Sequence, residues 1–118
     1  MNESIFRLRE RDEIIGYLRI VNDSSYYSIN GYQWSGKTIE YTDKDLFTGF
    51  KDRNDKRIFE RDIVSSTDYP LNEYIIHHDA LLNKFLLVSY ENRDIFNLSL
   101  DEFFRHKPRV CRIGFLRN

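Results

Sequence analysis

The 118-residue sequence contains one cysteine and one alanine, and both shortages narrow the structures it can form. With Cys111 alone, no internal disulfide can form and no cysteine-rich metal site can be assembled. Alanine has the highest helix propensity of all residues, and it occurs only at position 80, which disfavours a mainly helical domain. We therefore expect a core held together by side-chain packing.

The sequence also lacks an excess of charge and a long apolar run. Its 18 basic and 19 acidic residues give a net charge of −1. The overall charge therefore gives no reason to expect binding to nucleic acid or to a membrane surface. No apolar run is long enough to span a bilayer, and the N-terminus lacks the pattern of a signal peptide. The length suits one domain over residues 1–118, and we expect it to be cytoplasmic, with no membrane contact.

Strand-forming residues are abundant in the composition, including 8 Tyr and 9 Phe. Asn30-Gly31 is a strong signal for a type I′ hairpin turn, which would place Tyr32 and Trp34 on one strand face. Ile39 and Tyr41 are expected on the strand that follows. The first part of the chain, residues 1–57, is thus predicted to form antiparallel hairpins, with strands over 6–9, 14–21 and 26–29 and a further turn at 54–55.

The second part, residues 58–118, is predicted to form strands over 58–64, 74–78, 84–90, 94–98 and 110–116. A capping box at Ser99 and Glu102 starts a short helix near 99–106, which Pro108 ends. A helix over 79–90 is a competing interpretation, because the leucines there also fit a period of 3.6. A helical turn before the last strand resembles the order of a small SH3-like barrel. The predicted fold class is therefore mainly β, a β-rich α+β fold.

Residues 41–64, YTDKDLFTGFKDRNDKRIFERDIV, resemble the signature of the YopX family of phage and prophage proteins. That signature reads approximately Thr-Gly-Leu, Lys-Asp, a basic residue, Asn-Gly, Lys, an acidic residue, Ile-Tyr, Glu-Gly-Asp-Ile-Val. Phe50 here replaces its leucine and Arg57 its acidic residue, whereas Asp55 and Arg61 replace its two glycines. Asp tolerates the left-handed backbone of a glycine position more readily than Arg does.

The end of the chain, residues 110–118, is similar to the family's closing segment, although more loosely. The resemblance implies a mobile-element origin and a small β-rich fold. It implies no reaction and no catalytic residues.

Residues 31–38, GYQWSGKT, match the pattern of a phosphate-binding P-loop. That chemistry needs a strand before the loop and a helix that opens at Lys37, so that backbone N–H groups converge on the phosphates. The residues after Lys37 prefer strand, and the loop carries the bulky Tyr32 and Trp34. We therefore interpret the segment as two hairpin turns, and a nucleotide-dependent enzyme remains the least favoured of three hypotheses.

Other reactive side chains suggest no cofactor or metal. His77 and His78 are neighbours on a predicted strand and point to opposite faces, so they cannot easily bind one ion together. His106 is isolated in sequence. Cys111 is interpreted as a buried packing residue rather than a nucleophile.

The favoured function is a non-enzymatic interaction with an unidentified host or phage protein, or with a second copy as a homo-oligomer. Aromatic residues suit protein interfaces, and the candidate partner-binding residues are Tyr27, Tyr32 and Trp34. The alternative is a nucleic-acid-binding module. It would use the cations of a C-terminal segment that contains no acid: Arg105, Lys107, Arg109, Arg112 and Arg117. These cations could equally pair with acids elsewhere in the chain.

Overall fold

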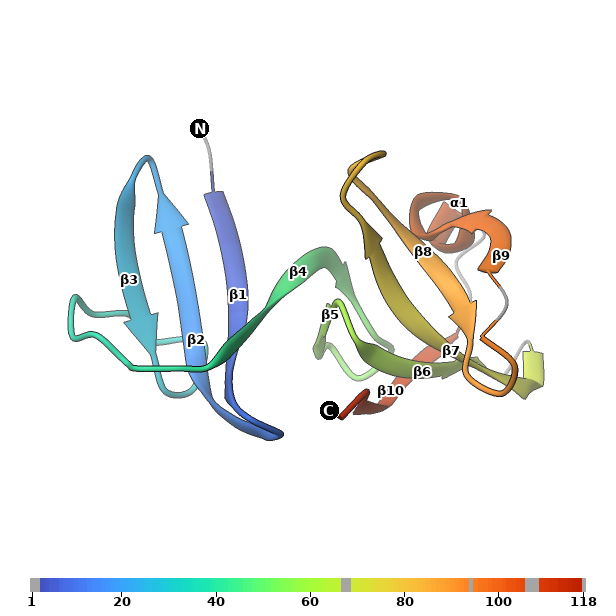
Figure 1. The fold of residues 1–118 in the computed structure, drawn as a ribbon, viewed down its shortest axis with the longest axis horizontal. Helices are drawn as coiled ribbons and strands as arrows, with labels where there is room; N and C mark the ends of the chain where they lie inside the picture. Colours follow the sequence, from blue (N-terminus) through green and yellow to red (C-terminus); the bar gives the residue numbers. More distant parts are fainter. Residues whose placement is uncertain (1–2, 67–68, 94, 106–108, 118) are drawn as a thin grey trace. The chain divides into compact units, whose positions relative to one another are not determined.

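The computed structural model describes residues 3–66, 69–93, 95–105 and 109–117, which contain ten strands and one short helix (Figure 1). Every strand pair named below is antiparallel, so the predicted mainly β fold of antiparallel hairpins is confirmed. In chain order the elements are β1 (Glu3–Glu10), β2 (Glu13–Val21), β3 (Ser24–Ser28), β4 (Asp43–Lys51), β5 (Arg57–Phe59), β6 (Asp62–Ser66), β7 (Tyr69–Asp79), β8 (Lys84–Ser89), β9 (Ile95–Ser99), α1 (Leu100–Arg105) and β10 (Val110–Phe115).

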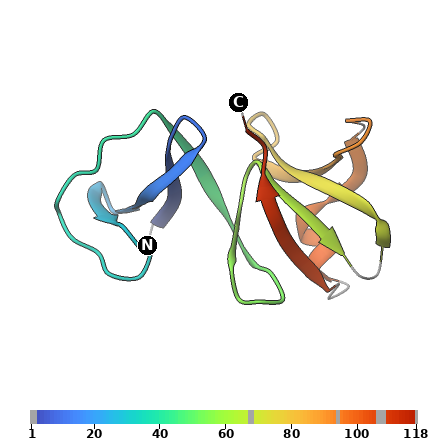
Figure 2. The ribbon, with the colours of Figure 1, turned by 90° about the horizontal axis from the view of Figure 1, so that it is seen from below.

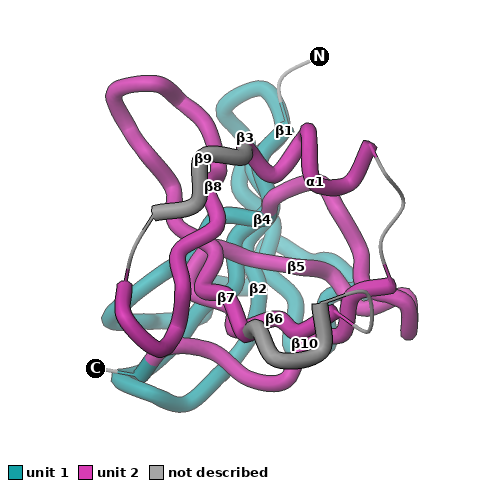
Figure 3. The backbone as a smooth tube through the Cα atoms, turned by 90° about the vertical axis from the view of Figure 1, so that its right-hand side faces the viewer, with its two compact units in different colours: residues 1–47, 117–118 teal, residues 48–116 magenta. Residues whose placement is uncertain are grey.

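The chain divides into two compact units (Figure 3). Unit 1 comprises Met1–Phe47 with Arg117–Asn118, and unit 2 comprises Thr48–Leu116. The boundary falls inside β4, whose first residues pair with β1 in unit 1. It therefore lies earlier in the chain than the division between residues 57 and 58 that the sequence suggested.

Unit 1 is built on the strand order β3-β2-β1-β4. The β1–β2 hairpin turns at Arg11, whose φ of 59° is left-handed. Cross-strand partners share a sheet face, and here Phe6 lies opposite Leu18 and Leu8 opposite Gly16. Leu8 and Leu18 are buried, so this face is the apolar side of the sheet.

The opposite face of that sheet buries a charged cluster of Arg7, Arg9 and Asp45. Arg7 and Arg9 lie on one side of β1, and Asp45 lies directly across from Arg7 on β4. Asp45 Oδ2 is 2.8 Å from both Arg7 Nη2 and Arg9 Nε, and Asp45 Oδ1 accepts a bond from Arg9 Nη2 at 3.0 Å. The three side chains are at most 3% exposed. Burial alone would lower the pKa of Arg9, but the Asp45 carboxylate raises that pKa above its ordinary value.

Unit 2 contains the sheet β10-β6-β7-β8-β9, in which β6 pairs with both β7 and the last strand, β10 (Figure 2). This order, with α1 preceding the last strand, agrees with the small SH3-like barrel expected from the sequence, and among the described residues the sheet is open between β9 and β10. Its core consists of apolar side chains from the strands and α1, namely Ile58, Val64, Tyr74, Ile76, Leu87, Leu100, Phe103 and Val110.

Helix α1 begins where the sequence predicted it. Ser99 Oγ accepts the backbone N–H of Glu102 at 3.3 Å, which satisfies one of the donors at the start of the helix. Leu100 and Phe103, one turn apart, are buried in the core of unit 2. The predicted stop at Pro108 lies outside the described residues. Strand β8 occupies residues 84–89, so the competing helix over 79–90 is wrong.

A tight turn over residues 52–56 is fixed by the buried carboxylate of Asp52. Its Oδ1 accepts the backbone N–H groups of Asn54 and Lys56, both at 2.9 Å, and its Oδ2 accepts that of Arg112 on β10 at 3.0 Å. Burial by itself would raise the pKa of Asp52, but these N–H donors and the Arg112 charge lower that pKa below its ordinary value. One carboxylate thus joins the turn to the last strand.

Candidate functional site

A long irregular loop, residues 29–42, joins β3 to β4 in unit 1. The predicted strands around Tyr32 and Trp34 and around Ile39 and Tyr41 are therefore wrong. Strand propensity reflects packing on a pleated surface more than an intrinsic backbone preference, so it does not by itself make these residues pair as strands.

The start of this loop is held by side chains that take the place of a hairpin ladder. Asn30 Oδ1 accepts the backbone N–H groups of Tyr32 at 2.8 Å and Gln33 at 3.0 Å. Gly31 has a φ of 87°, and its N–H donates to Ser28 Oγ at 2.8 Å. The chain does reverse between Tyr27 and Ser35, which form an antiparallel bridge, but the predicted type I′ turn is wrong. That turn needs a positive φ at both central residues, and of this pair only Gly31 has one. Side-chain hydrogen bonds that compete with strand pairing hold the loop instead.

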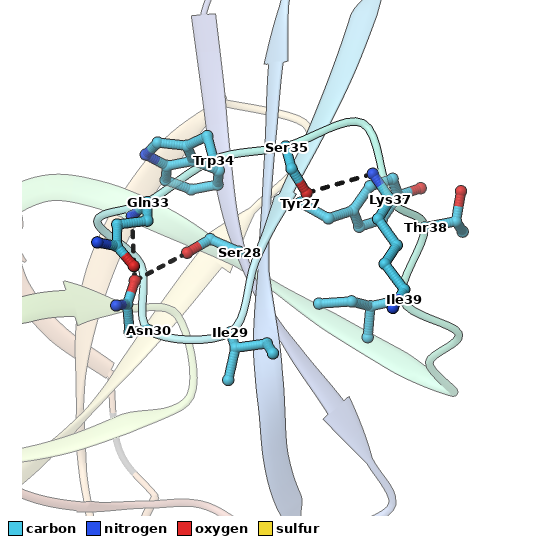
Figure 4. Close-up of a pocket in the computed structure, with 10 residues that line it drawn as sticks. All are labelled: Tyr27, Ser28, Ile29, Asn30, Gln33, Trp34, Ser35, Lys37, Thr38 and Ile39. Atoms are coloured by element: carbon cyan, nitrogen blue, oxygen red, sulfur yellow. Dashed lines mark hydrogen bonds between the residues drawn. The ribbon is translucent and has the colours of Figure 1, made fainter.

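The loop and the end of β3 surround a hollow of about 340 Å³ (Figure 4). Tyr27 is joined to the loop by a short bridge to Ser35, with N···O distances of 2.7 and 2.9 Å. Among the lining residues only Lys37 is charged. The hollow is lined by apolar and aromatic side chains, Tyr27, Ile29, Trp34 and Ile39, and by polar ones, Ser28, Asn30, Gln33, Ser35, Lys37 and Thr38.

The structure brings two of the three predicted partner-binding residues to this hollow. Tyr27 and Trp34 line it, and the Arg19 guanidinium carbon lies 6.0 Å from the centroid of the Trp34 ring. Tyr32 does not line the hollow but is 74% exposed on the same loop. Sequence reasoning missed Ile29 and Ile39 as wall residues. It also left Lys37 without a role.

Gly16 on β2 lies against this loop and provides a test of its packing. A Cβ there would stand 2.8 Å from both Ile39 Cδ1 and the Ser28 carbonyl oxygen. We expect Gly16→Ala to lower the free energy of unfolding of unit 1 by about 1–3 kcal/mol, because backbone must move. Urea unfolding followed by the fluorescence of Trp34, the single tryptophan, measures this.

The matched control is Gly36→Ala. A Cβ at Gly36 would meet nothing within 4 Å, so the change should stay below about 0.5 kcal/mol. Equal losses in the two variants would show that the loop does not pack on Gly16.

The P-loop pattern does not form a phosphate cradle in this loop. The segment after Lys37 is irregular as far as residue 42, and no helix opens there. The backbone N–H of Lys37 donates to Ser35 Oγ at 3.3 Å. The convergence of helix N–H groups that phosphate binding requires is therefore not present at residues 31–38.

The predicted nucleic-acid-binding residues are distributed over both units. Arg105 on α1 and Arg109 before β10 are exposed in unit 2. Lys107 lies outside the described residues. The cations of the segment thus do not all belong to one element.

Arg112 and Arg117 of that set make structural contacts. Arg112 is half-buried, and its Nη1 donates to the Arg57 carbonyl at 3.2 Å. Arg117, which clusters with unit 1, donates from Nη1 to the Asp12 carbonyl at 3.3 Å. The Arg112 contact is part of the framework around the 52–56 turn.

The described residues include no group of three or more His, Cys, Asp and Glu side chains that could hold a metal ion. His77 is exposed, whereas the His78 ring packs 4.9 Å from that of Phe85. Cys111 is half-buried, so its prediction as a buried residue is wrong: Val110 points to the core, and its strand neighbour therefore points away.

Comparison of the chain with protein-family models, with curated proteins and with solved structures gives no match. Within the described part of the chain, no helix has the length and apolar character needed to cross a membrane. The site must therefore be interpreted from its own geometry.

Proposed function

We propose that this chain is a protein-interaction module of phage or prophage origin that acts by binding inside a host cell. Its binding surface is the aromatic loop surface, which we define as Tyr27, Tyr32 and Trp34 with the hollow beside them. The observation that carries the proposal is the 74% exposure of Tyr32 on a loop whose start is fixed by Asn30.

Aromatic side chains are enriched at the centres of protein interfaces because they bury much area at little cost in side-chain entropy. A binding loop whose backbone is already ordered loses less entropy when its partner docks. The Asn30 contacts and the Tyr27–Ser35 bridge supply that order here. The hollow next to Trp34 offers a place for a side chain of the partner.

The resemblance to the YopX family supports the proposed origin. Asp55 and Arg61 stand where the family signature has glycines, and their φ angles are 63° and 72°. Both positions therefore require the left-handed backbone that glycine adopts most readily. This agreement concerns the turns of unit 2 and is separate from the binding surface in unit 1.

The proposal is tested by affinity capture from cells that carry the phage, followed by binding measurements with the purified protein that is retained. We expect Tyr32→Ser to weaken this binding by about 10-fold or more, because exposed tyrosines at an interface centre are frequent hot spots. Isothermal titration calorimetry measures the affinity.

The matched control is Tyr90→Ser, which removes a tyrosine that is 40% exposed in unit 2. Its affinity should equal that of the unmodified chain. If Tyr90→Ser weakens binding and Tyr32→Ser does not, the aromatic loop surface is not the binding surface. If nucleic acid is retained instead, and its binding falls steeply with salt and with Arg109→Ala, the alternative function replaces this one.

A further inference from the structure

The hairpin between β7 and β8 exposes two neighbouring leucines at its tip. Leu81 is 98% exposed and Leu82 is 61% exposed. Single apolar side chains on a surface are ordinary, but an adjacent pair at the end of a hairpin forms a small apolar knob. We call residues 79–83 the leucine tip.

The backbone of the leucine tip is ordered by its own polar side chains. Asp79 Oδ1 accepts the backbone N–H groups of Leu81 at 3.0 Å and Leu82 at 3.2 Å. Asn83 takes the left-handed φ of 50° that closes the turn, and its Oδ1 lies 3.3 Å from His78 Nε2. The leucines are thus presented in a fixed arrangement, which reduces the entropy lost when they insert into a partner.

The hollow of the aromatic loop surface has the complementary chemistry. A cavity of about 150 Å³ lined by apolar groups holds a benzene-sized guest, so about 340 Å³ has room for two branched aliphatic side chains. Tyr27, Trp34 and Ile39 supply apolar walls. The single charge of the lining, on Lys37, is opposite in sign to that of Asp79, whose carboxylate orders the backbone of the leucine tip.

We propose that the leucine tip of one copy inserts into the hollow of a second copy, with Asp79 facing Lys37. This inference rests on the proposed function, because it names a second copy of the chain as the partner of the same surface. The contact joins two different patches, so each copy brings one tip and one hollow to the association. The unmodified chain should therefore associate increasingly as its concentration rises.

Sedimentation velocity of the full chain, up to the order of hundreds of micromolar, tests this with two kinds of variant. The tip variant is Leu81→Ser with Leu82→Ser. The hollow variant is Ile29→Asp with Lys37→Glu, and all four of these side chains are exposed, so neither variant should disturb folding. Each variant alone should associate about 10-fold or more weakly than the unmodified chain.

An equimolar mixture of the two variants provides the decisive measurement. The intact tip of the hollow variant can enter the intact hollow of the tip variant, so the mixture should form a 1:1 dimer that grows no further. Trp34 emission should shift to shorter wavelength in the mixture and in neither variant alone. The control Ile113→Ser removes an exposed aliphatic residue of β10 and should associate as the unmodified chain does.

Two results would overturn the inference. One is an unmodified chain that stays monomeric at every concentration, and the other is a mixture that stays monomeric while the unmodified chain associates. In either case, loss of capture by Tyr32→Ser with retention by Tyr90→Ser would leave the proposed function standing with a different protein as occupant. If instead the mixture forms the dimer and the Tyr32→Ser test fails, the insertion of the leucine tip into the hollow stands and the proposed function falls.

Discussion

Replacing Asp45 by asparagine is expected to lower the free energy of unfolding of unit 1 by about 3–5 kcal/mol. Asn is nearly isosteric with Asp, so the loss comes from charge and not from a cavity. Without the carboxylate, the guanidinium groups of Arg7 and Arg9 lose their shared Asp45 counterion inside a nearly water-free face of the sheet. The asparagine amide would also point a donor at groups that only donate.

Urea unfolding followed by Trp34 fluorescence reports this change, because Trp34 belongs to the same unit. Asp43→Asn is the matched control: it neutralises a half-buried carboxylate two residues earlier on β4 that accepts a bond from Thr42 Oγ1 at 3.1 Å. Its loss should stay below about 1 kcal/mol. A similar loss in both variants would mean that the carboxylate of Asp45 has no special role in holding the buried arginines.

The hairpins could be predicted because their signals are local. The β1–β2 turn at Arg11, the 52–56 turn and the β7–β8 hairpin each separate short apolar segments, and all three occur where they were expected. The start of α1 was equally visible in the capping residue Ser99. Turn residues between short apolar segments mark such features within a few positions of sequence.

The buried charged cluster could not be predicted in the same way. Alternating Arg7 and Arg9 on a strand is the pattern of a solvent-facing side, and nothing near them in sequence marks them as buried. Their partner Asp45 is 36 and 38 residues away, and only the β1–β4 pairing brings the three together. The burial of the two arginines therefore follows from long-range strand pairing, which the local pattern does not reveal.

The candidate site was predicted only in part. Tyr27 and Trp34 were identified by residue type, and they do line the hollow. Ile29, Lys37 and Ile39 were assigned to strands and turns, although the density of Ser, Gly, Asn and Thr over residues 28–38 is itself a loop signal. A hollow made by an irregular loop depends on side-chain hydrogen bonds that a period-2 pattern does not encode.

The acid sensitivity of unit 2 should depend on Asp52, and Asp52→Asn is expected to lower its free energy of unfolding by about 2–4 kcal/mol at neutral pH. An asparagine can still accept the two N–H groups at Oδ1. It turns an NH₂ toward the Arg112 N–H, however, so a bond at 3.0 Å becomes a contact between two donors. The turn would then lose this bond to β10 and keep the one from the Arg53 N–H to the Val110 carbonyl at 2.8 Å.

The pH dependence has a definite sign. The pKa of Asp52 is lowered in the folded state, so the unfolded chain binds the proton more tightly. The contribution of this carboxylate is therefore fully present above the unfolded pKa of about 4 and is lost as the pH falls through the folded value. The difference in unfolding free energy between the unmodified chain and Asp52→Asn should thus be largest near pH 7 and shrink toward pH 2.

Amide hydrogen exchange locates the effect, because the N–H group of Arg112 should lose protection in Asp52→Asn, whereas that of Lys56 keeps its acceptor at Oδ1. Asp55→Asn is the matched control, since Asp55 is exposed in the same turn and asparagine accepts its φ of 63°. That variant should change stability by less than about 0.5 kcal/mol at any pH. A protonated Asp52 and an asparagine present the same neutral oxygen to the turn. If the stability difference between the unmodified chain and Asp52→Asn stays constant from neutral to strongly acidic pH, the acid sensitivity therefore lies elsewhere in the unit.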